Sequence, residues 1–451
     1  MTDTLENAHA LFCGGKYTES LAMYNRIRKS SAEGREKGIA ASMAMTIYKE
    51  GLTGPGMKKA MEEAGMEGMK YSCPLARFYF YTSDQEVSDE EFTLLLTDLR
   101  SLAKEGNSQA MVQMGLIYAY GIHLREDLEK AGNWLEKAAK LGNPIAMLQL
   151  AFLYLEPDFS KADDHEAYVW TLKSAASGYR EAEFQLAYFF WRGIGIEEDQ
   201  AKAVFLFRKA ADAGQTEACG ALFHIYTELG FEDENGKEVL DPEKGFLYAK
   251  KGASLDDHDC TMDLAFCYYR GLGTEKDFEK AREWYEKAWN CADPAAGCAL
   301  GTMYAEGCFG DDRKKEGISY LNQAIREGSV DAIRELGLCY AYGMGVEIDM
   351  DRAISLLQEG VSEKDGPSAR ELGKMYLKDR KFQESFDAFR KADEYNDGEG
   401  SFYLALFYIK GVMVPKNFKK AQEILYRSAG NGYKWAKDLL DKGFSHIEGV
   451  M

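Results

Sequence analysis

The chain repeats one short motif nine times at a nearly constant spacing. The motif is Leu-Gly or Leu-Ala, or a close variant, and the second residue of each pair serves below as the reference position of its copy. Most reference positions are 36 residues apart, with one interval of 42 and one of 32. They are Gly115, Ala151, Ala187, Phe223, Ala265, Gly301, Gly337, Gly373 and Ala405. A fixed period in this range is typical of a solenoid of stacked supersecondary units.

A column of polar residues follows each motif. Twelve residues after the reference position most copies carry Asp or Asn, and the fourth copy joins them once a six-residue insertion is allowed. The column is Asp127, Asp163, Asp199, Asp241, Asp277, Asp349 and Asn417, with Arg313 as the exception. Asp and Asn are strong helix N-caps because the side chain accepts a hydrogen bond from a free backbone N–H. Each unit is therefore predicted to be a helix A, a turn, and a helix B that begins at this residue.

An aromatic residue stands three positions after each reference position. The column is Tyr118, Tyr154, Phe190, Tyr226, Tyr268, Tyr304, Tyr340, Tyr376 and Tyr408. With Trp134, Trp170, Tyr248 and Trp284 it is expected to fill the space between units. Small reference residues such as Gly115 and Gly301 are expected to let helices A and B approach each other closely.

Paired glycines between the two helices resemble the start of a dinucleotide-binding fingerprint. The pairs are Gly193 with Gly195, Gly271 with Gly273, and Gly343 with Gly345. No third glycine of the fingerprint follows, no strand precedes, and a cofactor loop is needed only once. The first glycine of each pair is instead predicted to end helix A in the left-handed conformation. The second is expected to ease the turn before the Asp cap.

These columns resemble the Sel-1-like repeat family, a branch of the tetratricopeptide-like helical repeats. The seventh copy, Ala332 to Asp349, shows the first half of the family pattern almost in full, and the likeness runs from about Gly106 to Gly430. The resemblance implies an all-α fold, a right-handed superhelical solenoid of antiparallel helix pairs. It implies about nine clear units, preceded by about three degenerate helix pairs.

Three segments are expected along the chain. Residues 1–105 are interpreted as a degenerate tetratricopeptide-like cap, with helix pairs at about 5–33, 34–67 and 69–105, because terminal units must present a polar face. Residues 106–430 form the repeat array, and residues 431–451 a closing helix and tail. Two copies depart from the pattern: the fourth carries the insertion Glu232 to Val239, and the eighth is shortened near Lys378.

Composition narrows the class of partner and the location. The net charge of -19 argues against a nucleic acid or an anionic membrane surface as partner. The N-terminus shows no basic segment followed by an apolar core, and the longest apolar run, Phe402 to Ile409, is too short to span a bilayer. Nine cysteines without an export signal are expected to be reduced thiols, so a cytoplasmic location is predicted.

No catalytic, cofactor or metal site is predicted. The six histidines form no HExxH motif and no metal-like pair with cysteine, so they are interpreted as surface or packing residues, with His224 able to line a groove. Cys260 with Cys267, and Cys291 with Cys298, lie seven residues apart; disulfide stapling is known in secreted relatives, but buried free thiols are favoured here. The insertion has hints of a phosphate or calcium loop but lacks the required residues, so a solvated loop is expected.

The family geometry places helix A on the concave surface, where a partner could bind. Carried over by register, the candidate partner-binding residues are Tyr120, Phe152, Phe184, Tyr188, Trp191, Arg192, Met262, Phe266, Tyr269, Arg270, Arg334, Tyr342, Arg370 and Lys374. Aromatic and Arg side chains make binding hot spots, although each aromatic could equally pack between units. The resulting prediction is a non-enzymatic scaffold or adaptor that binds a protein or peptide. The alternatives are a small-ligand sensor or enzyme that uses the same concave pocket, and a secreted effector that acts by protein binding.

Overall fold

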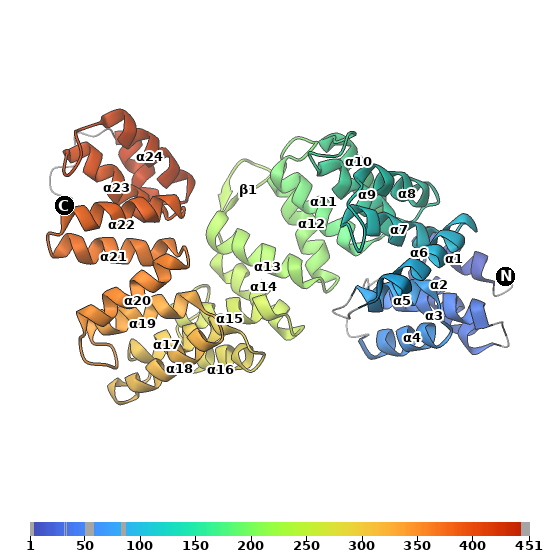
Figure 1. Cartoon of the computed structure of the whole chain (residues 1–451), viewed down its shortest axis with the longest axis horizontal. Helices are drawn as coiled ribbons and strands as arrows, with labels where there is room; N and C mark the ends of the chain where they lie inside the picture. The colour runs from blue at the N-terminus through green and yellow to red at the C-terminus, as the bar shows by residue number, and fades with distance from the viewer. Residues whose placement is uncertain (1–3, 31, 33, 50–57, 83–86, 443–451) are drawn as a thin grey trace. The chain divides into compact units, whose positions relative to one another are not determined.

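A computed structural model of the chain describes residues 4–30, 32, 34–49, 58–82 and 87–442. Within these ranges the protein is a repeat solenoid of α-helices with one short pair of strands (Figure 1). The predicted all-α repeat fold is therefore confirmed. Contacts between residues divide the chain into two compact units, Met1–Cys260 and Thr261–Met451.

The described part of the first unit holds six helices followed by four helix pairs. The six helices are α1 (Leu5–Cys13), α2 (Tyr17–Lys29), α3 (Gly34–Lys49), α4 (Lys58–Lys70), α5 (Pro74–Tyr81) and α6 (Asp89–Lys104). The pairs are α7 (Ser108–Ala119) with α8 (Leu128–Lys140), α9 (Pro144–Leu155) with α10 (Asp164–Ala176), α11 (Arg180–Arg192) with α12 (Gln200–Asp212), and α13 (Thr216–His224) with α14 (Pro242–Ser254). Helix α6 packs against α7, so stacking continues across residue 105, and the segment boundary expected there stays a prediction.

The second unit continues the alternation of A- and B-helices. Its A-helices are α15 (His258–Arg270, which starts at the end of the first unit), α17 (Pro294–Ala305), α19 (Val330–Tyr342), α21 (Gly366–Lys378) and α23 (Gly398–Lys410). Its B-helices are α16 (Phe278–Trp289), α18 (Lys314–Arg326), α20 (Met350–Ser362), α22 (Phe382–Glu394) and α24 (Phe418–Gly430). Helix α25 (Lys434–Lys442) packs on α24, and residues 443–451 of the expected tail lie outside the described residues.

The Asp and Asn column caps the B-helices as predicted. In seven B-helices the side chain of the column residue accepts a hydrogen bond from the backbone N–H three residues later. Each such cap stabilises its helix by about 1 kcal/mol. The exception, Arg313, makes no side-chain cap and ends a short 3-10 helix, η2 (Asp311–Arg313). The sequence therefore located the start of most B-helices correctly.

The aromatic column and, in most repeats, a basic residue three positions after the cap close the turn between helices A and B. The backbone N–H of Asp127 donates to the carbonyl of Tyr118 over 2.9 Å, and Asp277 does the same to Tyr268. Lys130 then lies over the ring of Tyr118, 5.4 Å from its centre, and contacts Asp127 at 2.8 Å. A cation over an aromatic ring adds a modest attraction. The column therefore joins the two helices within each repeat.

Glycines allow the closest approaches between neighbouring segments. A Cβ atom on Gly301 would lie 2.6 Å from Leu321 of the partner helix, which confirms the expected role of the small reference residue. Gly193 and Gly343 end their helices with φ of 66° and 74°, the predicted left-handed cap. The second glycine does more than ease a turn, because a Cβ on Gly195 would lie 2.0 Å from the backbone oxygen of Asp164 in the preceding repeat.

The insertion in the fourth repeat is more ordered than the solvated loop expected from the sequence. Helix α13 runs into a π-helical turn, η1 (Ile225–Leu229), and strands β1 (Phe231–Glu232) and β2 (Glu238–Val239) then pair antiparallel. The Asp233 carboxylate accepts hydrogen bonds from two backbone N–H groups of the hairpin loop. The insertion is exposed to solvent, as expected, but its two short strands were not predicted from the sequence.

Candidate binding surfaces

The A-helices of the first unit expose part of the predicted aromatic set. Tyr120, Tyr188 and Arg192 lie at the C-terminal ends of α7 and α11 and are exposed to solvent. The guanidinium of Arg192 lies 5.7 Å from the centre of the Tyr188 ring, and its Nε donates to the Tyr188 hydroxyl over 3.3 Å. This pair forms a preorganised edge of aromatic and cationic character.

Three other predicted residues of this unit are half-buried. Phe152, Phe184 and Trp191 each keep part of their surface accessible. The ring of Phe184 lies 5.5 Å from the ring of Phe207 on α12, so it contributes to packing between the helices of its own repeat. These three residues therefore combine packing with a partly accessible face, and their role in binding stays a prediction.

In the second unit, the predicted residues of α15 are mostly engaged with neighbours. Met262 and Tyr269 pack against the hydrophobic cluster around Tyr285. The hydroxyl of Tyr269 donates to Glu306 over 2.5 Å, and burial together with this carboxylate raises the pKa of Tyr269. Arg270 is exposed and lies 5.8 Å from the centre of the Phe266 ring.

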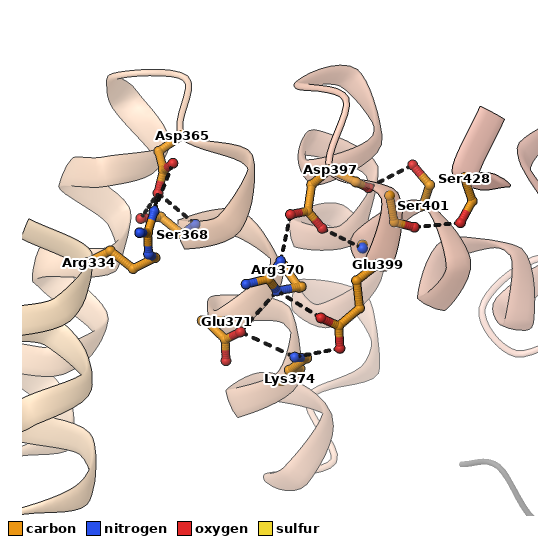
Figure 2. A network of polar contacts seen from close by, with 12 residues as sticks. Arg334, Asp365, Ser368, Arg370, Glu371, Lys374, Asp397, Glu399, Ser401 and Ser428 are labelled. Carbon is orange, nitrogen blue, oxygen red and sulfur yellow. Dashed lines mark hydrogen bonds and ion pairs between the residues drawn. The ribbon is translucent and has the colours of Figure 1, made fainter. Parts of the chain in front are cut away.

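The three predicted cations of α19 and α21 form ion pairs between repeats (Figure 2). Arg334 donates to Asp365, the N-cap of α21, at 3.0 Å, and Arg370 donates to Asp397, the N-cap of α23, at 2.7 Å. Each Arg lies three residues before its reference position, and each Asp lies eight residues before the next one. The contact is therefore a repeated device, called the ladder below, that joins the A-helices of consecutive repeats.

Further carboxylates surround the ladder. Arg334 also contacts Asp331 at 2.7 Å, and Lys374 lies 2.7 Å from Glu399 and 3.2 Å from Glu371. Burial opposes the charge of Arg334 and Lys374, but the carboxylates outweigh it and raise the pKa of both groups. Burial of Glu335 raises its pKa, and the nearby positive charge of Arg334 offsets only part of this rise.

The sequence prediction did not anticipate the carboxylate partners of these cations. Asp365 and Asp397 precede helix A rather than helix B, so they lie outside the column from which the caps were predicted. Because Arg334, Arg370 and Lys374 are already paired, they offer less to a partner than their sequence positions suggest. Tyr342 of α19, in contrast, is exposed at the position equivalent to Tyr120.

Two surface cavities in the described part of the chain are lined by residues other than the predicted partner-binding residues. One of about 800 Å³ is lined by the turn from Gly345 to Asp351 with Lys315 and Ile318. The other, about 560 Å³, is bordered by His9 and neighbouring residues of α1. His9 contacts the Ser108 hydroxyl at 2.8 Å, and burial lowers the pKa of His9, so this histidine has the packing role interpreted from the sequence.

The structure also shows where the possible metal-ligating side chains and the cysteine thiols lie. Among the described residues, no group of three or more His, Cys, Asp or Glu side chains is positioned to hold a metal ion. His224 is exposed and lies 3.3 Å from Glu228 on the same face of its helix. None of the nine cysteines, all of which lie within the described ranges, forms a disulfide, and Cys291 is exposed. No helix in the described part of the chain has the length and apolar character needed to cross a bilayer.

The fold and these surfaces define the chain as a helical-repeat protein. The family model of the Sel1 repeat matches eight segments, residues 108–143, 144–179, 180–215, 226–257, 258–291, 294–329, 330–365 and 398–433. The chain therefore belongs to the Sel1 repeat family. The unmatched stretch between residues 365 and 398 is the shortened eighth unit, in which Lys381 precedes helix α22 as an N-cap residue without a side-chain hydrogen bond.

Individual relatives agree with this assignment. Over 241 residues the chain is 27% identical to chitin synthase regulatory factor 3 of Schizosaccharomyces pombe, covering 51% of this chain and 25% of that protein. The chain thus spans about a quarter of the length of this relative. The crystal structure of c5321, a protective antigen of uropathogenic Escherichia coli with an SLR fold, superposes with a TM-score of 0.53 at 23% identity, covering 86% of this chain and 82% of that one.

A second solved structure, a Sel1 repeat protein from Oxalobacter formigenes, is 23% identical with a TM-score of 0.47 and covers 81% of this chain and 93% of that one. Sel1 repeat proteins are generally scaffolds for protein interactions and are typically non-enzymatic. This is the class of function that the family supports.

Proposed function

We propose that the chain is a non-enzymatic scaffold that binds a protein or peptide through the exposed aromatic residues of its A-helices. The observation that carries the proposal is the exposure of Tyr120, Tyr188 and Tyr342 in the last turn or at the end of their A-helices, whereas Tyr118, two residues before Tyr120, is buried. Tyr side chains supply a large amphipathic contact area and lose little rotamer freedom when they bind. Solvated aromatic residues of this size are therefore good anchors for a partner.

One of these residues, Tyr342, shares helix α19 with the ladder residue Arg334. The cations of α19 and α21 are held by carboxylates in the ladder, which makes this part of the A-helix surface stiff and already paired. A rigid surface loses less entropy when a partner docks. The fission yeast relative is named as a regulatory factor of an enzyme, which agrees with action through binding.

A cytoplasmic location is part of the same proposal. It is supported by the cysteine residues, none of which forms a disulfide within the described structure. Extracellular domains commonly contain disulfides, whereas cytosolic proteins keep their thiols reduced.

The test compares the wild type with a triple variant, Tyr120→Ala, Tyr188→Ala and Tyr342→Ala. Tyr426→Ala is the matched control, because Tyr426 is as exposed as Tyr342 but lies on the B-helix α24. Each protein is immobilised, challenged with native lysate, and the retained proteins are quantified by mass spectrometry. Dissociation constants of the purified partners are then measured by calorimetry.

The proposal expects partners that bind the wild type and the control but bind the triple variant at least about ten-fold more weakly, since each anchor contributes about 1 kcal/mol or more. The thermal midpoint of all variants should stay within about 2 °C of the wild type, because exposed side chains contribute little to stability. If the triple variant keeps every partner at unchanged affinity, the A-helix tyrosines are not the binding residues and the proposal fails.

A further inference from the structure

Helix B presents one register position to solvent in every repeat. This position is the sixth residue after the N-cap, and it is exposed or half-exposed in each copy. The residues are Asn133, Val169, Phe205, Leu247, Glu283, Ser319, Ser355, Asp387 and Glu423. Six copies carry a polar residue here, and the three apolar copies are consecutive, on α10, α12 and α14 of the first unit.

The two strongest members of this group lie on adjacent helices. Phe205 of α12 is 64% exposed and Leu247 of α14 is 59% exposed, so each leaves most of a large apolar side chain in water. Lys251 of α14 lies 2.6 Å from Asp212 of α12, so one ion pair joins the C-terminal ends of these consecutive B-helices. Leu172 of α10, one turn beyond Val169, is also exposed. Single exposed apolar residues are common, but a run in one register over consecutive repeats gathers apolar surface on the B-helix side of this part of the array.

Positive charge surrounds this patch. One helical turn before or after Phe205 and Leu247 stand basic residues, because positions three and four apart share a helix face. They are Lys202, Arg208 and Lys209 on α12, and Lys244, Lys250 and Lys251 on α14. Against these six cations the two helices carry only the carboxylates of Asp212 and Glu243, in a chain whose net charge is -19.

Most of the cations have intramolecular partners. Arg208 donates to the Tyr226 hydroxyl over 2.9 Å, and three of the lysines pair with carboxylates. Lys209 lies 2.7 Å from Glu183, and Lys244 lies 2.8 Å from Asp241. Ion pairs of exposed lysines contribute less than about 1 kcal/mol each, so a ligand that brings its own carboxylates can exchange with them. The patch therefore keeps its basic character toward an acidic ligand.

We propose that this patch, here called the outer patch (Val169, Leu172, Phe205 and Leu247 with the six flanking cations), docks an acidic amphipathic helix of a partner protein. An ion pair joins the C-terminal ends of α12 and α14, and residues seven positions apart on an α-helix are separated by about 10 Å. A partner helix that crosses α12 and α14 can therefore set two apolar residues, seven positions apart, on Phe205 and Leu247. Its Asp and Glu residues then face the flanking cations.

A protein partner is favoured over an anionic membrane. The net charge of -19 opposes the approach of the whole molecule to an anionic bilayer, whereas the charge of an acidic helix is small and local. The outer patch belongs to B-helices, so this inference goes beyond the proposed role of the A-helices and does not depend on it.

The test is a display library of helical peptides about five turns long, in which the charge and the apolar positions are randomised. The library is selected on the full-length wild type and counter-selected on the variant Phe205→Asp with Leu247→Asp. The expected sequences have a net negative charge and apolar residues seven positions apart. A selected peptide should bind the variants Phe205→Ala with Leu247→Ala, and Lys202→Glu with Lys250→Glu, at least about ten-fold more weakly than the wild type.

Controls separate this inference from the alternatives. Tyr426→Ala, an exposed aromatic of another B-helix, and Tyr188→Ala on helix α11 should both leave peptide binding unchanged. Loss of binding in Tyr188→Ala alone would move the site to the A-helices and overturn the inference. The inference would also be overturned if the enriched peptides carried no negative charge, or if no peptide distinguished the wild type from the Asp variant. Patch-dependent binding to vesicles of phosphatidylcholine and phosphatidylserine, without peptide selection, would show that the occupant is a membrane.

Discussion

Replacing Arg370 with Met should destabilise helix α23 and the repeats next to it. Arg370 reaches from α21 to Asp397, which caps α23 by accepting the backbone N–H of Gly400 over 2.6 Å. The side chain of Asp397 is 6% exposed and that of Arg370 is 22% exposed. The variant therefore leaves a buried carboxylate without its closest cation. Helices α21, α22 and α23 lie side by side in Figure 1, so the disturbance should extend through this part of the second unit.

The magnitude follows from the burial of the pair. Removing one partner of a fully buried ion pair costs about 3–5 kcal/mol, because the remaining charge is neither solvated nor paired. Arg370 keeps some contact with water, and the backbone N–H of Gly400 still donates a hydrogen bond to Asp397 in the variant. The expected loss of unfolding free energy is therefore about 2–4 kcal/mol. Adding Asp397→Asn should recover at least half of the loss, because Asn removes the charge but remains a good N-cap.

Hydrogen exchange measured by mass spectrometry on the full-length chain is the appropriate assay, since it reports the opening free energy of α21 to α23 separately from the rest. Arg390→Met is the matched control: its pair with Asp387 is 3.2 Å long but lies on the surface of α22, so the change should stay below about 0.5 kcal/mol. The reasoning is refuted if Arg370→Met costs less than about 1 kcal/mol, or if the effects of Arg370→Met and Asp397→Asn are additive.

Two further predictions use the titrating groups. Burial raises the pKa of Glu335 above its ordinary value near 4.5, so the stability linked to this group is present below that pH and is lost as the pH rises through the folded pKa. Glu335→Gln should therefore gain thermal stability relative to the wild type on going from about pH 4 to about pH 7. A difference between the two melting temperatures that does not change with pH would contradict this prediction. Burial raises the pKa of Cys13 and Cys219 to about 11, whereas Cys291 is exposed. A disulfide reagent at about pH 8 should therefore label one thiol rapidly, and Cys291→Ser should abolish that fast phase. A fast phase that survives the substitution would contradict the assignment to Cys291.

Several features of the fold could be predicted from the sequence because they depend on residues close together in the chain. Asp127 caps α8 through the backbone N–H of Lys130, three residues away, so the cap appears in the sequence as a short pattern. Gly343 ends α19 because a left-handed residue is needed directly after the helix, and only glycine adopts that conformation without strain. Repetition then made these local signals visible above the background of unrelated residues.

Other features depended on contacts between residues about one repeat apart. Gly195 looked like a turn residue, but the structure shows that it must be glycine because the backbone of Asp164 occupies the space of a Cβ. The predicted partner-binding residues fell into two groups. Tyr120 and Tyr188 are exposed, as a binding role requires, whereas Phe184 packs on Phe207. An aromatic residue has the same letter in the sequence whether its face meets water or another ring.

What the sequence by itself determined was therefore the repeat, the two helices in each unit, the start of most B-helices and the end of the A-helices that a glycine closes. The helix starts and ends follow from hydrogen bonds that span a few positions. Only the tertiary structure decided which A-helix cations are held by carboxylates, as Arg334 is by Asp365 and Arg370 by Asp397. It also decided that Phe205 and Leu247 face water on adjacent helices. The physical reason is that ion pairing and burial depend on the distance between stacked repeats in space, and the spacing of residues along one repeat does not contain that distance.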